Sequence, residues 1–184
     1  KKINSLNQII LVQKSPLNEI NAIPEIVNFE DCLLNDNDLQ FESLPFNHPL
    51  FIMYSSGTTG KPKCIIHGAG GTLLQHLKEH RLHTNIKKND RVFFFTTCGW
   101  MMWNWLVSAL ASEATIVLYE GSPCFPDPNH LWKIAEEEKI NIFGVSPRYL
   151  SSLMKEKHEP KKHNDLSSIK TILSTGSPLL VDHF

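Results

Sequence analysis

Apolar residues gather in short runs that are separated by amphipathic stretches and by turn residues. Runs typical of buried strands cover residues 9–13, 50–54, 64–67, 91–96, 115–119, 142–145 and 170–174. Helices are predicted between them: one capped by Thr72, a Trp-rich one after the run at 91–96, one from Asp127 or Asn129 to near Lys139, and one from Pro147. This alternation predicts an α/β fold: a mainly parallel sheet with helices on both faces.

The most apolar stretch, residues 100–119, is long enough to raise the question of a membrane span. It carries Asn104 and Glu113 and has no flanking basic anchors, so a buried helix followed by a buried strand is the better interpretation. Trp105, Leu106 and Ala109 are expected in the core. No repeat or low-complexity linker divides the chain, and residues 1–184 are predicted to form a single, partial domain.

The composition indicates a folded chain without a strong overall field. Hydrophobic residues make up 41% of the 184 residues, which excludes wholesale disorder and a collagen-like chain. The formal net charge is -1, so neither nucleic acid nor an acidic membrane is an expected partner, and any anion site must be local. The four cysteines stand far apart without a C-x-x-C pair, which favours a reducing, cytoplasmic setting.

The candidate chemistry is concentrated in residues 54–63, directly after a predicted strand. Gly57 and Gly60 permit positive φ and close backbone approach, so consecutive N–H groups can form a concave cradle for an anion. Hydroxyl groups and two ammonium groups supply further donors, a combination that suits a polyphosphate. The candidate phosphate-binding residues are Ser55, Ser56, Gly57, Thr58, Thr59, Gly60, Lys61 and Lys63.

Two common phosphate-binding patterns do not fit this loop. Only two residues separate the glycines and Pro62 follows the lysine, so the Walker pattern is absent, and no G-x-G-x-x-G opens a helix after a strand. Ser/Thr/Gly-rich stretches are also often plain solvent loops. The long ordered run at 54–63, however, resembles residue for residue the phosphate loop of the adenylate-forming superfamily of acyl-CoA synthetases, luciferases and peptide-synthetase adenylation domains.

Further motifs extend the resemblance from about residue 50 to the end of the chain. His67 with Gly70 and Gly71 is similar to the H-x-x-G-G continuation of the short-chain branch. Residues 97–105 resemble the segment that lines the acyl pocket, and residues 174–179 resemble the segment that borders the adenine. By this resemblance the acyl pocket includes Trp100, Met101 and Met102, and the adenine site includes Thr175, Gly176, Ser177 and Pro178.

The resemblance implies an ATP-dependent acid–thiol ligase. A carboxylate would attack the α-phosphorus of ATP and expel pyrophosphate, and the thiol of coenzyme A would then displace AMP. Acetoacetate is the preferred acid, because residues 97–105 and 174–179 are similar to the branch that activates it, and acetate or another short acid is the alternative. The expected partners are therefore small molecules: the acid, ATP with Mg²⁺, and coenzyme A. A truncated, non-catalytic nucleotide-binding module is the alternative from a different class.

The resemblance also implies that the chain is an internal fragment of a large N-terminal domain. The family motifs that follow the adenine segment, including a lysine of the C-terminal domain that is used in adenylation, are not found before Phe184. The C-terminal domain is thus expected to be absent. We therefore expect that the chain alone does not turn over ATP.

The histidines in two parts of the chain each permit two interpretations, a functional role and a structural one. His67 either orients the phosphate loop or has a structural role near a strand end. His76, His80 and His83 fall on one face of a helix, which is the spacing of a metal site. Charged neighbours on the same helix indicate a solvent-exposed face instead, so no metal site is predicted.

Overall fold

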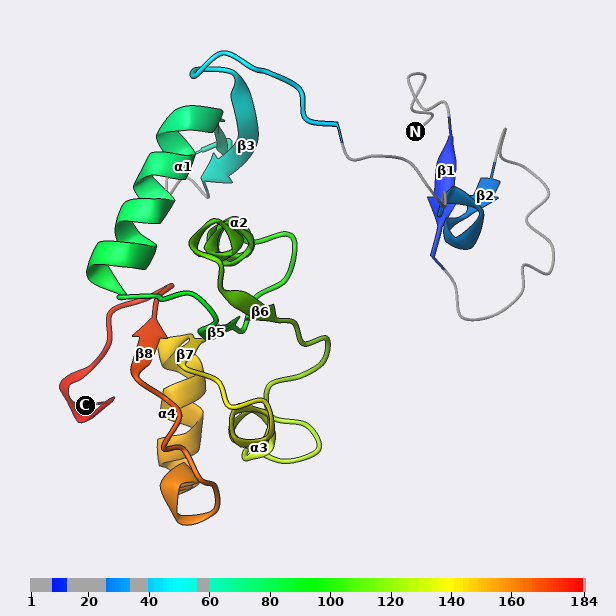
Figure 1. The fold of residues 1–184 in the computed structure, drawn as a ribbon. Helices are drawn as coiled ribbons and strands as arrows, with labels where there is room; N and C mark the ends of the chain where they lie inside the picture. Colours follow the sequence, from blue (N-terminus) through cyan, green and yellow to red (C-terminus); the bar gives the residue numbers. More distant parts are fainter. Residues whose placement is uncertain (1–7, 13–25, 34–39, 56–59, 184) are drawn as a thin grey trace. The chain divides into compact units, whose positions relative to one another are not determined.

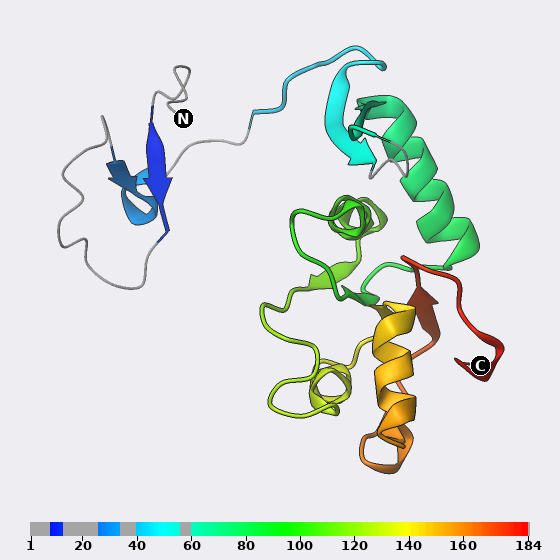
Figure 2. The same cartoon turned by 180° about the vertical axis from the view of Figure 1, so that it is seen from behind.

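The computed structural model describes residues 8–12, 26–33, 40–55 and 60–183 of the chain. The chain separates into two compact units, Lys1–Ser43 and Leu44–Phe184 (Figures 1 and 2). In the first unit, β1 (Ile9–Leu11) pairs in parallel with β2 (Ile26–Asn28), and a 3₁₀ turn, Phe29–Cys32, follows. The second unit contains every segment that carries the family resemblance.

A four-stranded parallel sheet organises the second unit. Its strands are β5 (Arg91–Phe94), β6 (Thr115–Val117), β7 (Ile142–Val145) and β8 (Thr171–Ser174), in the order β6-β5-β7-β8. All three pairings within it are parallel, which confirms the predicted fold class. The apolar runs in the sequence therefore identified these strands correctly, because strands covered on both faces are apolar throughout.

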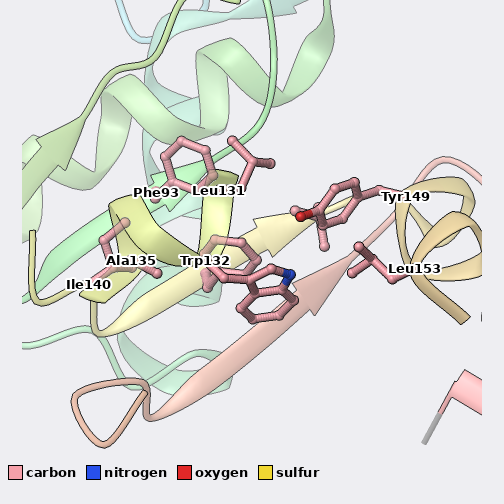
Figure 3. Close-up of a cluster of buried hydrophobic side chains, with 9 residues drawn as sticks. Phe93, Leu131, Trp132, Ala135, Ile140, Tyr149 and Leu153 are labelled. Atoms are coloured by element: carbon pink, nitrogen blue, oxygen red, sulfur yellow. The ribbon is translucent and has the colours of Figure 1, made fainter. Parts of the chain in front are cut away.

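One face of this sheet packs against α3 (His130–Glu137) and α4 (Pro147–Lys155) (Figure 3). The Phe143 ring stacks between Phe93, at 5.4 Å between centroids, and Trp132, at 4.5 Å. Each large side chain buried this way contributes about 1.5–3 kcal/mol of transfer free energy. This face is a dry aromatic core.

The opposite face packs against α2 (Met101–Ser108) and the 3₁₀ turn Ala109–Ser112. Side chains alternate along each strand, so Val92 and Phe94 lie on this face while Phe93 lies on the other. Trp105, Leu106 and Ala109 are buried here, as predicted. Helices thus cover both faces of the sheet.

None of the helices in the described part of the chain combines the length and apolar character that crossing a bilayer needs.

The starts of α3 and α4 were predicted correctly. Asn129 precedes α3, and its backbone N–H donates to the Asp127 carboxylate at 2.8 Å. Ser146 precedes α4, and its hydroxyl accepts from the backbone N–H of Tyr149 at 3.3 Å. Pro147 occupies the first turn of α4, where its missing N–H costs no hydrogen bond.

The two strands around the phosphate loop form a separate hairpin. β3 (Pro49–Ser55) pairs antiparallel with β4 (Lys63–Gly68). The connection of residues 56–62 is too short for a parallel crossover, which needs a dozen or more residues. The hairpin leads directly into α1 (Ala69–Lys78) and a π-helical turn, Glu79–His83.

The prediction that Thr72 caps α1 is wrong. The helix begins at Ala69, and Thr72 is buried within it. Its first N–H groups instead donate to backbone carbonyls of the preceding segment: Ala69 to His48 and Gly70 to Phe46, each at 2.8 Å. The Phe46 ring occupies the space that a Cβ at residue 70 would need, so only glycine fits there. The hydroxyl of Thr72 was a misleading signal, because backbone carbonyl groups accept the hydrogen bonds at the start of this helix.

The prediction of a solvent-exposed histidine face on this helix is wrong for His80. Its ring is fully buried, lies 4.4 Å from the Trp105 ring in an edge-on arrangement, and its Nε2 lies 3.0 Å from the Trp105 carbonyl oxygen. The charged residues Lys78 and Arg81 are exposed, as their sequence positions suggested. One residue of the face therefore joins the π-helical turn to α2, and charged neighbours in the sequence do not reveal this.

Polar residues fasten the amino ends of the sheet strands. The Asp90 carboxylate accepts from Lys170 Nζ at 2.6 Å and from the backbone N–H of Lys87 at 2.9 Å. The Asn141 amide accepts from the backbone N–H of Arg91 at 2.9 Å and donates to the Ser168 carbonyl at 3.1 Å. The segments that enter β5, β7 and β8 are thereby joined to one another.

Candidate nucleotide and acid site

The predicted phosphate loop is held at both ends by the hairpin ladder. Ser55, the last residue of β3, is the register partner of Lys63, the first residue of β4. Gly60 has φ +150°, a backbone conformation that other residues rarely adopt, as the sequence predicted. Lys61 and Lys63 are exposed, and neither forms an ion pair with another described residue. Ser56, Gly57, Thr58 and Thr59 lie outside the described residues.

The carboxyl ends of three sheet strands meet around a cavity of about 650 Å³. Residues 94–97 after β5, Ser146 and Arg148 after β7, and residues 175–177 after β8 line it. Trp100, Met101 and Met102 line it as well, so the predicted acyl-pocket residues and three of the four predicted adenine residues come together. Pro178 is exposed and does not line this cavity. Gly176 has φ +104°, which makes it a second position that favours glycine.

A neighbouring cavity of about 720 Å³ lies between α1, α2 and the end of β8. Its apolar wall consists of Phe94, Met101, Met102, Trp105 and Leu173. Its polar wall comes mainly from α1 and the π-helical turn: Gln75, His76, Glu79 and His83. Phe94, Met101, Met102 and Thr175 line both cavities, which are therefore adjacent. The pair offers two adjoining spaces, each lined by apolar side chains and a few polar groups.

The polar wall is held by hydrogen bonds between α1 and α2. Glu79 accepts from Trp105 Nε1 at 3.0 Å through one carboxylate oxygen and from Gln75 Nε2 at 2.6 Å through the other. Asn104 of α2 donates to the Met53 sulfur of β3 at 3.4 Å, which ties the same helix to the hairpin. The arrangement fixes the position of Trp105, whose ring forms part of the apolar wall.

The hydrogen bonds of His76 define its tautomer. The Ser108 hydroxyl donates its only proton to the Asn104 carbonyl, so it can only accept from His76 Nδ1, which lies 2.6 Å away. Burial lowers the pKa of His76, and His67 nearby acts in the same direction, while Glu79 opposes them. The ring is therefore neutral near pH 7, with Nδ1 protonated and Nε2 unprotonated, and the residue lines the larger cavity.

His80 is a second neutral imidazole on this helix. Burial lowers its pKa to about 4, chiefly by penalising the charged form, with a further contribution from His76. Its Nε2–H donates to the Trp105 carbonyl, and its buried Nδ1 has no partner among the described residues. His80 does not line either cavity, so we regard it as a structural residue.

Phe94 is a cavity residue that sequence reasoning placed only in a strand. It lies opposite Gly144 in the neighbouring strand, and its ring fills the space of the missing Cβ. Glycine at 144 thus lets the ring lie flat against the sheet and form the floor of both cavities. A glycine in the middle of a predicted buried strand was the available signal, because such a residue often marks close approach of another group.

Arg148 and Glu79 were also missed. Arg148 follows the carboxyl end of a parallel strand, the position at which α/β sheets bind ligands, so its place after the run 142–145 could have identified it. Glu79 was read only as part of a charged helix surface. His67, by contrast, was singled out and lines the larger cavity. Among the described residues, no group of three His, Cys, Asp or Glu side chains could hold a metal ion.

The chain belongs to the family of AMP-binding enzymes, which matches residues 3–183. It is 53% identical over 166 residues to the acetoacetyl-CoA synthetase of Gallus gallus and 56% identical over 146 residues to the acetoacetyl-coenzyme A synthetase of Rhizobium meliloti (strain 1021). These matches cover 88% and 79% of this chain but only 25% and 22% of the relatives. The solved acetoacetyl-CoA synthetase from Streptomyces lividans superimposes with a TM-score of 0.85 at 42% identity, over 97% of this chain and 27% of that chain. The chain therefore spans about a quarter of the length of the relatives it matches.

Proposed function

We propose that the whole protein to which this chain belongs is an acetoacetate–CoA ligase that forms AMP and pyrophosphate from ATP. The observation that carries the proposal is the identity of about half of all residues to acetoacetyl-CoA synthetases over most of the chain. The paired cavities support it, because a nucleotide and a short acid need adjoining spaces for the carboxylate to reach the α-phosphorus.

In this proposal the loop after β3 binds the β- and γ-phosphates. Ser55, Gly60, Lys61 and Lys63 contribute from the described residues, together with residues 56–59. Charge develops on the phosphates when the acid attacks, so backbone N–H groups and lysine ammonium groups stabilise the leaving pyrophosphate. A Mg²⁺ ion bound with ATP would lie against the phosphates held by this loop and would offset part of their charge.

The adenylate would lie in the smaller cavity. Thr175, Gly176 and Ser177, which line it, border the adenine in this proposal together with the next residue in the chain, Pro178, and Arg148 supplies a cation beside the nucleotide. Met101 and Met102 line both cavities and would separate the adenylate from the far part of the acid, while Trp100 lines the smaller cavity beside them. Thioether side chains adapt their shape, which suits them to a wall around a small acid.

A reducing cellular compartment is part of the same proposal. The four cysteines are exposed and free, a state that suits a reducing environment such as the cytoplasm.

The test compares two acids in one assay. The full-length protein should catalyse acid-dependent exchange of pyrophosphate into ATP with acetoacetate far better than with acetate, and should then form acetoacetyl-CoA when coenzyme A is added. Equal or better exchange with acetate would contradict the assignment of acetoacetate. Binding of ATP without any acid-dependent exchange would favour the alternative, a non-catalytic nucleotide-binding module.

The isolated chain should be inactive. Because it spans about a quarter of the relatives' length, we expect no acid-dependent release of AMP from the purified 184-residue chain. Release of AMP at a rate comparable to that of the full-length protein would contradict this expectation.

A further inference from the structure

The α1 wall of the larger cavity holds a fixed carboxylate. Both oxygens of Glu79 accept hydrogen bonds, one from Trp105 of α2 and one from Gln75, a turn earlier in α1. A carboxylate that accepts at both oxygens is kept in one orientation. The phosphate loop and the adenine border do not involve this residue, so the function described so far leaves it unexplained.

The described residues of this wall place no lysine or arginine beside the Glu79 carboxylate. Among the described residues that line the larger cavity, none is lysine or arginine. His76, on the same wall, is neutral near pH 7, and its Nδ1–H is bonded to Ser108. This end of the cavity therefore offers acceptors and negative charge to whatever lies against it.

The orientation of the acid follows from the positions of the two cavities. Its reacting carboxylate must point toward the smaller cavity, where Arg148 and the end of β8 lie. The far end of the acid then points toward α1 and Glu79. Acetoacetate ends there in a neutral methyl ketone, whereas malonate, which has nearly the same size and shape, ends in a second carboxylate.

We propose that Glu79 is a specificity-determining residue that excludes acids with an anionic far end. The inference rests on the proposed function, because it places the activated acid in this cavity. Like charges in a cavity with an apolar opposite wall repel strongly, and malonate would lose its hydration there without gaining a cation. An acid with a neutral far end meets no such barrier.

The test measures pyrophosphate exchange by the full-length protein with acetoacetate, malonate and malonamate, in which an uncharged amide replaces one carboxylate of malonate. The wild-type protein should use acetoacetate and malonamate, with kcat/KM for malonate lower by about 100-fold. Glu79→Gln keeps an oxygen for Trp105 and removes the charge, so it should raise the ratio of malonate to acetoacetate at least about tenfold. Gln75→Lys, which adds a cation beside Glu79 at an exposed position, should shift this ratio in the same direction.

Glu137→Gln is the matched control, because it removes one exposed carboxylate from α3, away from both cavities, and should leave the ratio unchanged. An unchanged ratio in both Glu79→Gln and Gln75→Lys would overturn the proposal. The proposal would also be overturned if the wild-type protein rejected malonamate as strongly as malonate, since the size or polarity of the far end, and not its charge, would then determine specificity. Equal use of acetoacetate and malonate by the wild-type protein would overturn the role of Glu79 alone, whereas use of malonate without acetoacetate would overturn the proposed function as well.

Discussion

The two edges of the parallel sheet use their polar side chains in opposite ways. At the amino edge, Asp90 and Asn141 bond to the segments that enter the neighbouring strands. At the carboxyl edge, the side chains of Arg148, Thr175 and Ser177 line a cavity and make no hydrogen bond to another described residue. Polar groups that satisfy one another stabilise the fold, while polar groups left open can bind a ligand. The difference predicts which residues matter for stability and which for function.

The largest effect is expected at the amino edge. Asp90 is 5% exposed, so Asp90→Ala leaves a backbone N–H and the Lys170 ammonium group without their acceptor. We expect a loss of about 3–4 kcal/mol in unfolding free energy, measured by urea denaturation, with the preference for acetoacetate over acetate unchanged. Asp182→Ala removes an exposed carboxylate and serves as the control. A loss below about 1 kcal/mol would show that this edge is not fastened as described.

The next largest effect is a loss of stability at acid pH, which we expect from the buried His80. The folded protein holds the pKa of His80 at about 4, against 6.5 for the free side chain. Between these pH values the imidazole of residue 80 binds a proton in the unfolded chain but not in the folded chain. The contribution of His80 to the unfolding free energy is therefore constant above pH 6.5 and falls as the pH drops toward 4. The loss from this group reaches up to about 3 kcal/mol.

His80→Gln tests the origin of that pH dependence. Glutamine can still donate to the Trp105 carbonyl but does not titrate, so urea denaturation at a series of pH values should give a flatter profile for the variant. His76 titrates in the same direction and will leave a residual slope. Identical slopes for the wild-type protein and the variant would contradict the neutral, buried state of His80.

Gly144 lies between the two edges and should affect both stability and binding. A methyl group at 144 would overlap the Phe94 ring, which must then move away from the floor of both cavities. We expect Gly144→Ala to cost about 2 kcal/mol in urea denaturation and to raise KM for the acid. Gly71→Ala is the control for the stability measurement alone, because a Cβ there meets no atom within 4 Å although the residue lines the larger cavity. Equal behaviour of the two variants would argue against the packing role of Gly144.

The smallest effect on stability is expected at the carboxyl edge. Arg148 is exposed and unbonded among the described residues, so Arg148→Ala should change the unfolding free energy by less than about 0.5 kcal/mol. It should nevertheless raise KM for ATP about tenfold, since a charge-assisted contact is lost. Lys155→Ala, at the other end of α4, should change neither quantity. A large stability loss without a change in KM would reverse the assignment of this edge.

The central strands β5 and β7 were predictable from the sequence because both of their faces are buried. Runs such as 91–96 and 142–145 are apolar throughout. A parallel sheet with helices on both faces is the arrangement that buries several such runs at once. The phosphate loop was recognisable because its chemistry lies in ten consecutive residues. Signals of this kind are local, so a single sequence contains them in full.

Long-range contacts explain what the sequence did not reveal. The cap of α1 comes from carbonyls of residues 46 and 48, which no side-chain pattern records. The burial of His80 and the fixed carboxylate of Glu79 depend on Trp105, 25 and 26 residues away. Charged neighbours on a helix indicate solvent on average, but packing against a second helix decides each side chain separately.

The antiparallel hairpin has a consequence for the order of folding. β3 and β4 are joined by residues 56–62 and can pair at a small loss of chain entropy, whereas β5 and β7 pair across an interval of about fifty residues. The scaffold of the phosphate loop can therefore form early, while both cavities must wait for the crossovers of the sheet. Pulse-labelling hydrogen exchange should show protected amides in β3 and β4 before those of β7, and simultaneous protection would contradict this order.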